Sequence, residues 1–109
     1  MAEGLHRRAV AQGQTSLGMI REIDPSGAPL DGGRRLWAQT EAVRTALAFG
    51  DANVGDLVDG LFATHLAADL PGLWVDSYDA EGQSHEAAAP ASSLYHLMTA
   101  FSELLRHKP

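Results

Sequence analysis

Apolar residues recur every three or four positions in four stretches of this 109-residue chain. This spacing places side chains on one face of a helix. The pattern predicts helices at about 3–12, 35–49, 52–68 and 90–106. Gly13 and Gly50 directly follow the first two stretches, and glycine at such a position commonly ends a helix.

The second predicted helix has two neighbouring rows of side chains. One row is the apolar face that is expected to pack inward, with Leu36, Thr40, Val43 and Leu47. The row beside it holds larger and charged side chains, with Trp37, Glu41, Arg44 and Ala48.

The third predicted helix combines a regular apolar stripe with two glycines. The stripe consists of Val54, Leu57, Val58, Leu61, Phe62 and Leu66. Asp51 is placed to cap the N-terminus of this helix, and Pro71 with Gly72 is expected to end it. Gly55 and Gly60 each weaken a helix by about 1 kcal/mol relative to alanine. Close packing against a neighbouring helix would account for them.

The fourth predicted helix separates an apolar side from a small and polar side. Its apolar stripe consists of Leu94, Leu97, Met98, Phe101, Leu104 and Leu105. His96 lies on the opposite side, among Ser92, Ser93, Thr99, Ala100 and Glu103. A histidine in this place, near the start of a helix, is a candidate acid–base group. The alternative is an ordinary solvent-exposed histidine.

Two turns of the same form divide the chain into similar halves. Residues 24–27 (Asp-Pro-Ser-Gly) suit a type I turn and predict a short β-hairpin within 17–31. Residues 79–82 (Asp-Ala-Glu-Gly) predict a second turn after an alternating segment, and 84–89 is expected to be loop. Each turn stands between two predicted helices, as in a repeat of helical hairpins. Such hairpins bury their apolar faces mainly against neighbouring hairpins, so residues 1–109 are expected to form one incomplete segment of a larger structure.

Composition narrows the class of protein. The length fits one domain at most, and 45% hydrophobic with 20% charged residues is ordinary for a globular chain. The net charge of −6 and the absence of a basic cluster argue against nucleic-acid and anionic-membrane binding. No segment has the pattern of a membrane span or a signal peptide. Because cysteine is absent, disulfides are excluded and a reducing cytoplasm is expected.

Trp37 and Glu41 form a second candidate site. They are four residues apart and therefore stand on one side of the second helix. An indole can stack on the apolar face of a sugar ring while a carboxylate accepts hydroxyl hydrogen bonds. The alternative places Trp37 in the core and pairs Glu41 with Arg44 or Arg34 on the surface.

Three stretches, in this order, resemble the C-terminal part of the N-acylglucosamine 2-epimerase family, in its mannose-isomerase-like branch. They are Arg35-Leu-Trp-Ala-Gln-Thr-Glu-Ala-Val-Arg, Gly72-Leu-Trp-Val-Asp-Ser-Tyr-Asp-Ala-Glu-Gly and Pro90-Ala-Ser-Ser-Leu-Tyr-His-Leu. The resemblance covers nearly the whole chain from about Leu5.

The resemblance implies an all-α fold of helical hairpins with short β-hairpin-like loops, the C-terminal portion of an (α/α)6 toroid around a sugar pocket. It implies that His96 is a catalytic acid–base group and that Trp37, Glu41 and Gln39 contact the sugar. It further implies proton transfer next to the sugar carbonyl, by two histidines, without a metal or a redox cofactor. Ala38 replaces the family's usual proline.

The family's other catalytic histidine lies in an upstream E-P-G-H-x-x-E-W motif, which this sequence lacks. His65 is expected to be a packed core residue, and His6, His85 and His107 lie near the N-terminus, in a loop and near the C-terminus. The expected partners are therefore a small sugar and either the missing N-terminal part of the barrel or further copies of this chain.

Two other functions remain open. One is a non-catalytic helical interaction module or an inactive remnant of such an enzyme. The other is a glycoside hydrolase, which would use a pair of carboxylates; Asp76 with Glu41 is the pair to consider.

Overall fold

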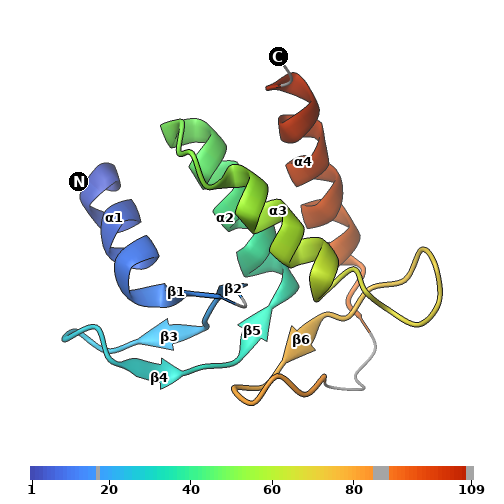
Figure 1. The fold of residues 1–109 in the computed structure, drawn as a ribbon, viewed down its shortest axis with the longest axis horizontal. Coiled ribbons are helices and arrows are strands. Elements are labelled where there is room, and N and C mark those ends of the chain that lie inside the picture. The colour runs from blue at the N-terminus through green and yellow to red at the C-terminus, as the bar shows by residue number, and fades with distance from the viewer. Residues whose placement is uncertain (17, 85–88, 108–109) are drawn as a thin grey trace.

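About half of the residues are helical, and the part of the chain that the structure describes contains four helices. The computed structural model describes residues 1–16, 18–84 and 89–107. The helices are α1 (Ala2–Gly13), α2 (Leu36–Phe49), α3 (Val54–Ala63) and α4 (Ser92–Arg106), shown in Figure 1. Helices were expected in all four places. Leu17, His85 and most of the expected 84–89 loop lie outside the described residues.

In the described residues, short strands between α1 and α2 and between α3 and α4 form three antiparallel pairs. The pairs are β1 (Gln14–Thr15) with β2 (Gly18–Met19), β3 (Glu22–Ile23) with β4 (Pro29–Asp31), and β5 (Arg34–Arg35) with β6 (Ser77–Tyr78). The β3–β4 hairpin confirms the predicted turn, since the Gly27 amide donates to the Asp24 carbonyl at 2.9 Å. The turn at Asp79 closes in the same way, with a 3.1 Å bond from the Gly82 amide. The β5–β6 pair joins the segment before α2 to the segment before α4.

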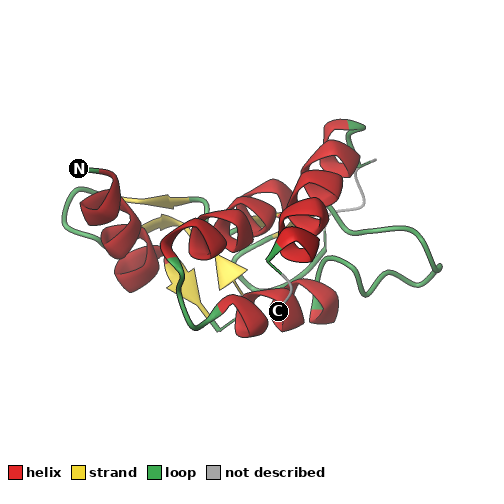
Figure 2. Cartoon of the chain, turned by 90° about the horizontal axis from the view of Figure 1, so that it is seen from above, coloured by secondary structure: helices red, strands yellow, loops and turns green. Residues whose placement is uncertain are grey.

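The core lies where α2 meets α3 and α4. Leu36, Leu61 and Leu97, one from each of these helices, form the buried cluster. Leu66, Trp74 and Phe101 cover its edge. In contrast, α1 packs mainly on the strands, at the opposite side of the molecule from α4 (Figure 1 and Figure 2), and meets α2 where His6 stacks on Phe49. No helix in the described residues combines the length and the apolar character needed to span a membrane.

The third helix is shorter than its sequence pattern predicts. It begins at Val54 and ends at Ala63, because the backbone of Thr64 leaves helical geometry (φ −118°, ψ −86°). The expected cap at Asp51 is wrong: the residue before the helix is Asn53, and Asp51 instead contacts His6. The apolar pattern of the sequence continues past Ala63, although the helix ends there. The reason is that Leu66 packs against the core after the chain has turned.

The fourth helix buries only part of its predicted apolar stripe, because Leu97 and Phe101 lie at the core while other residues of the stripe do not. Ser93, Leu97 and Ala100 are its buried residues. Half or more of the surface of Leu94, Met98 and Leu105 is exposed, although they belong to the apolar stripe. Small side chains let α4 approach α2 closely, and this rotates the helix so that the side with His96 faces α2.

Candidate functional site

Trp37 and Glu41 project from the first turns of α2, and the β5–β6 pair sets where that helix begins. Arg35 is still extended (φ −113°, ψ 142°), and the Leu36 amide donates to the Asp76 carbonyl at 2.8 Å. Leu36, Thr40 and Val43 are buried, as the sequence predicted. The neighbouring row that includes Trp37 is therefore turned away from the core.

The structure brings His96 to this row, although 55 residues separate it from Glu41. The His96 Nδ1 atom lies 3.3 Å from Glu41 Oε1, and the Trp37 and His96 rings are 6.3 Å apart between centroids. We call Trp37, Glu41 and His96 the His96 cluster. The His96 side chain retains 28% of its exposure and is therefore partly buried beside Glu41.

The Glu41 carboxylate has a second partner on its own helix. Arg44 Nη1 lies 3.1 and 3.2 Å from the two carboxylate oxygens, which is the pairing that the alternative interpretation proposed. Glu41 therefore contacts His96 and Arg44 at the same time. Trp37, in contrast, is 47% exposed and is not a core residue.

Gln39 lies away from the His96 cluster. Its side chain is buried, and its amide donates to the carbonyls of Met19 and Arg35 and accepts the Met19 amide proton. These bonds hold β2 against α2. The amide thus serves the packing of the hairpin in this structure.

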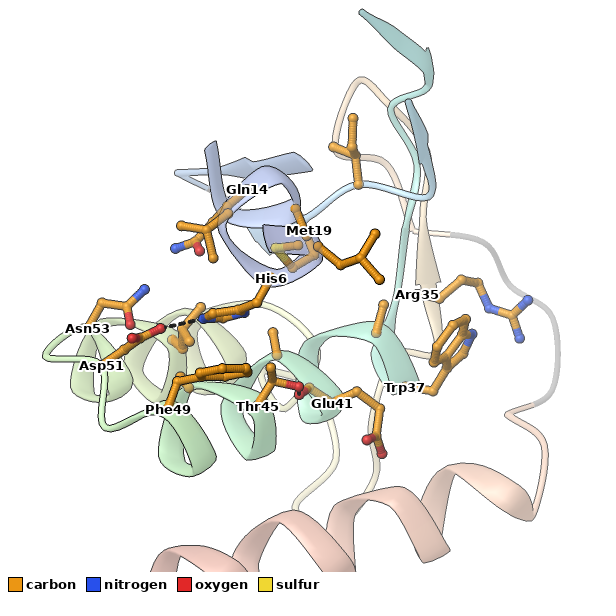
Figure 3. A pocket seen from close by; sticks show the side chains of 18 of the residues that line it. His6, Gln14, Met19, Arg35, Trp37, Glu41, Thr45, Phe49, Asp51 and Asn53 are labelled. Atoms are coloured by element: carbon orange, nitrogen blue, oxygen red, sulfur yellow. Dashed lines mark hydrogen bonds and ion pairs between the residues drawn. The ribbon is translucent and has the colours of Figure 1, made fainter. Parts of the chain in front are cut away.

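An open apolar groove of about 690 Å³ lies between α1 and α2. Trp37 and Glu41 line one end of it, and His6, Phe49 and Asp51 line the other (Figure 3). His6 Nε2 lies 2.6 Å from Asp51 Oδ2, and the imidazole stacks on Phe49 at 4.5 Å. The Glu41 carboxylate points away from His6, toward the ribbon of α4 (Figure 3).

The contact between His6 and Asp51 has no signal in the sequence. The two residues are 45 positions apart and belong to no shared motif. A contact of this kind is set only by how α1 and the end of α2 approach each other.

Asp76 joins the segments that precede the two helices of the cluster. Its Oδ2 atom accepts from Arg35 Nε at 3.2 Å and pairs with Nη2 at 3.1 Å. Its Oδ1 atom accepts from the Ser93 hydroxyl at 2.6 Å. With both oxygens engaged, Asp76 is poorly placed to act with Glu41 as a glycosidase pair.

His65 holds the chain directly before Asp76. The Val75 amide donates to the His65 carbonyl at 2.7 Å, and His65 Nδ1 lies 2.6 Å from the Val75 carbonyl. Burial lowers the pKa of His65, so the imidazole is neutral and Nδ1–H is the donor. The prediction of a packed core histidine is confirmed by its complete burial.

Burial likewise raises the pKa of the Tyr78 phenol, whose hydroxyl donates to the Thr64 carbonyl at 2.8 Å.

Across 1–16, 18–84 and 89–107, no three His, Cys, Asp or Glu side chains gather in a way that could hold a metal ion.

Comparison with known proteins gives two matches of interest. A family model described as N-acylglucosamine 2-epimerase (GlcNAc 2-epimerase) matches residues 1–100. A protein named mannose-6-phosphate isomerase, from Rhizobium meliloti (strain 1021), is 34% identical over 80 residues. That match covers 64% of this chain and 21% of the relative, so the matched region spans about a fifth of the relative's length. No solved structure matches the chain significantly.

Proposed function

This chain belongs to the N-acylglucosamine 2-epimerase family, and we propose from that membership that it forms part of a sugar isomerase or 2-epimerase. In this proposal, His96 transfers the proton, while Trp37 and Glu41 form the side of the sugar pocket that this chain contributes. Gln39 is left out of the pocket because its amide is bonded to the backbone of Met19 and Arg35.

The contact between His96 and Glu41, beside Trp37, is the observation on which the proposal depends. When Nδ1–H donates to the Glu41 carboxylate, the lone pair of Nε2 is left free to accept a proton. A carboxylate that fixes the orientation of an imidazole is a recurring feature of acid–base catalysis. Arg44 keeps the carboxylate in place through its two contacts.

The reaction needs one proton removed from carbon and one delivered to oxygen. His96 would take the proton from C2 of an open-chain aldose, and the C–H electron pair would form a C1=C2 double bond as the C1 oxygen gains a proton. Return of a proton to C1, with loss of the O2 proton, gives the ketose. Return to the other face of C2, with loss of the proton from the C1 oxygen, gives the epimeric aldose.

Trp37 would hold the apolar face of the sugar. Almost half of the surface of Trp37 is exposed, and its ring lies 6.3 Å from the His96 imidazole between centroids. Stacking of sugar C–H groups on an indole suits this position. The substrate class that follows is a hexose or a hexose derivative.

We further propose that additional helical hairpins complete an (α/α)6 toroid around this pocket and supply the second acid–base group. The apolar α1–α2 groove and the exposed apolar side of α4 support this, because both are surfaces on which a helix could pack. Another segment of a longer enzyme is the occupant that we favour, with a further copy of this chain as the alternative. A cytoplasmic location would suit a cysteine-free sugar enzyme.

The exposed side of α4 also favours a second candidate function, a non-catalytic helical module that docks on a partner. The two functions differ in whether the chain takes part in proton exchange with a sugar.

The deciding experiment measures exchange of the C2 proton of mannose, glucose and their 6-phosphates in D2O by NMR. It compares the protein with its His96→Gln and His107→Ala variants. We expect exchange to fall by at least about 100-fold in His96→Gln, because a general base contributes on that scale. The exposed His107 lies at the end of α4, so its variant should exchange normally.

Exchange that survives in His96→Gln would contradict the role of His96. Absence of sugar exchange even when the proposed additional hairpins are present would favour the docking module instead.

A further inference from the structure

Asp76 contacts both helices of the His96 cluster at their first turns. Its carbonyl accepts the Leu36 amide proton that begins α2, at 2.8 Å. Its carboxylate contacts Arg35, just before α2, and Ser93, in the first turn of α4. Trp37 directly follows Leu36, and His96 lies three residues after Ser93.

Burial makes these contacts strong and specific. The Asp76 side chain keeps only 12% of its exposure, and the Ser93 residue keeps 2%. Little water is available to replace a lost hydrogen bond there, and a buried carboxylate that loses its partners is costly. The arginine contact combines charge with two donor nitrogens, which makes it more directional than a lysine pair.

The segment that presents Asp76 is itself fixed. His65 brackets Val75 with a bond to its amide and a bond to its carbonyl, and the β5–β6 pairing places Ser77 opposite Arg35. Asp76 therefore cannot move without disturbing strand pairing on one side or the core on the other.

From these contacts we propose that Asp76 is a positioning residue. It sets the separation and the relative rotation of α2 and α4, and so the place of the His96 imidazole relative to Trp37 and Glu41. This inference rests on the proposed function for its catalytic consequence, although its geometric part stands without it.

Asp76→Asn is the informative substitution, because it preserves shape and removes the charge that holds Arg35. The matched control is Asp31→Asn, which makes the same change at the pair between Arg21 and Asp31, where both side chains are over 40% exposed. The first readout is the NMR cross-relaxation between the Trp37 indole and the His96 imidazole. We expect this signal to weaken in Asp76→Asn and to persist in the control.

The second readout is C2 exchange, divided into kcat and KM. Trp37 and Glu41 both stay on α2, so KM should change little, while kcat should fall by about 10- to 100-fold as the imidazole is displaced. Ser93→Ala breaks the same connection from the α4 side. Its effect on kcat should therefore be smaller than additive when it is combined with Asp76→Asn.

The two proposals fail in different ways. An unchanged Trp37–His96 signal in a folded Asp76→Asn protein would overturn the positioning role, whatever the activity. A weakened signal in Asp76→Asn, in a protein whose unaltered form exchanges no sugar proton even with the proposed additional hairpins present, would support the positioning role and overturn the proposed function. Should Asp76→Asn fail to fold, the Ser93→Ala variant gives the same test of the signal.

Discussion

At the scale of single residues, His65 makes the stability of the fold depend on pH. It is fully buried, its Nδ1–H donates to Val75, and its Nε2 atom finds no hydrogen-bond partner in the described part of the chain. Burial disfavours the imidazolium and lowers the pKa of His65 below its ordinary value of 6.5. His65 therefore binds a proton less readily in the folded protein than in the unfolded chain.

We predict that the free energy of unfolding falls as the pH drops below about 6.5, because the unfolded state then binds a proton that the folded state does not. His65→Asn keeps a donor near the Nδ1 position and removes the titrating group. Urea unfolding at about pH 7 and about pH 5 should show a smaller pH dependence in this variant. An equal dependence in both proteins would refute the role of His65.

The residues of the candidate site were predictable to different degrees. Trp37 and Glu41 could be paired from their spacing, since residues four apart share a helix side. His96 could be singled out by its motif, but its approach to Glu41 depends on how α4 rotates against α2. Gln39 follows the same motif as Trp37, and only the position of β2 shows that its amide is bonded to backbone.

At the scale of elements, the glycines of α3 are not explained by close packing. A Cβ atom added to Gly55 or Gly60 would meet nothing within 4 Å. Their effect is therefore to weaken the helix, and α3 is the shortest of the four helices in the described structure. Gly50 differs, because it ends α2 with φ +69°, a conformation that side chains rarely adopt.

These two positions give opposite predictions for the same substitution. Gly60→Ala should raise the free energy of unfolding by about 0.5–1 kcal/mol, because alanine suits a helix interior and the space is open. Gly50→Ala should lower it by about 1–2 kcal/mol, the cost of a left-handed conformation. Both are measured by urea unfolding, and a loss of stability in Gly60→Ala would show that the glycine has a packing role.

At the scale of the whole molecule, the exposed side of α4 stands out. The sequence marks Leu94 and Met98 as part of an apolar stripe, yet each is at least half exposed, and Leu97 between them is 5% exposed. The described part of the chain does not bury the whole apolar stripe of α4, because the face of α4 that contacts α2 is narrower than the stripe. An apolar stripe without a cover is typical of a surface that another protein segment occupies.

We predict that a dye specific for apolar surface binds the folded chain and that Leu94→Lys combined with Met98→Lys greatly reduces this binding. Stability should change by no more than about 0.5 kcal/mol per substitution, because both side chains are largely exposed. The matched control is Leu97→Ala, which should cost about 2–4 kcal/mol because it leaves a cavity in the core. Unfolding of the double lysine variant would mean that the stripe is already buried in solution.

Sequence by itself determined the order of the helices, the turns at Asp24 and Asp79, and the inward row of α2. Each of these depends on neighbours a few residues apart, through helical periodicity or turn chemistry. The family motifs likewise lie within short segments. Such local interactions depend only on residues that are close in the sequence, so they can be predicted without knowledge of the tertiary structure.

Tertiary structure alone decided which side of α4 faces the core, where α3 ends, and how Asp76 connects Arg35 with Ser93. These outcomes depend on packing between segments that are distant in sequence. Several faces of an apolar helix can be buried at similar free energy, and the fit between neighbouring side chains selects one. The same selection turns His96 toward Glu41 and so assembles the candidate site.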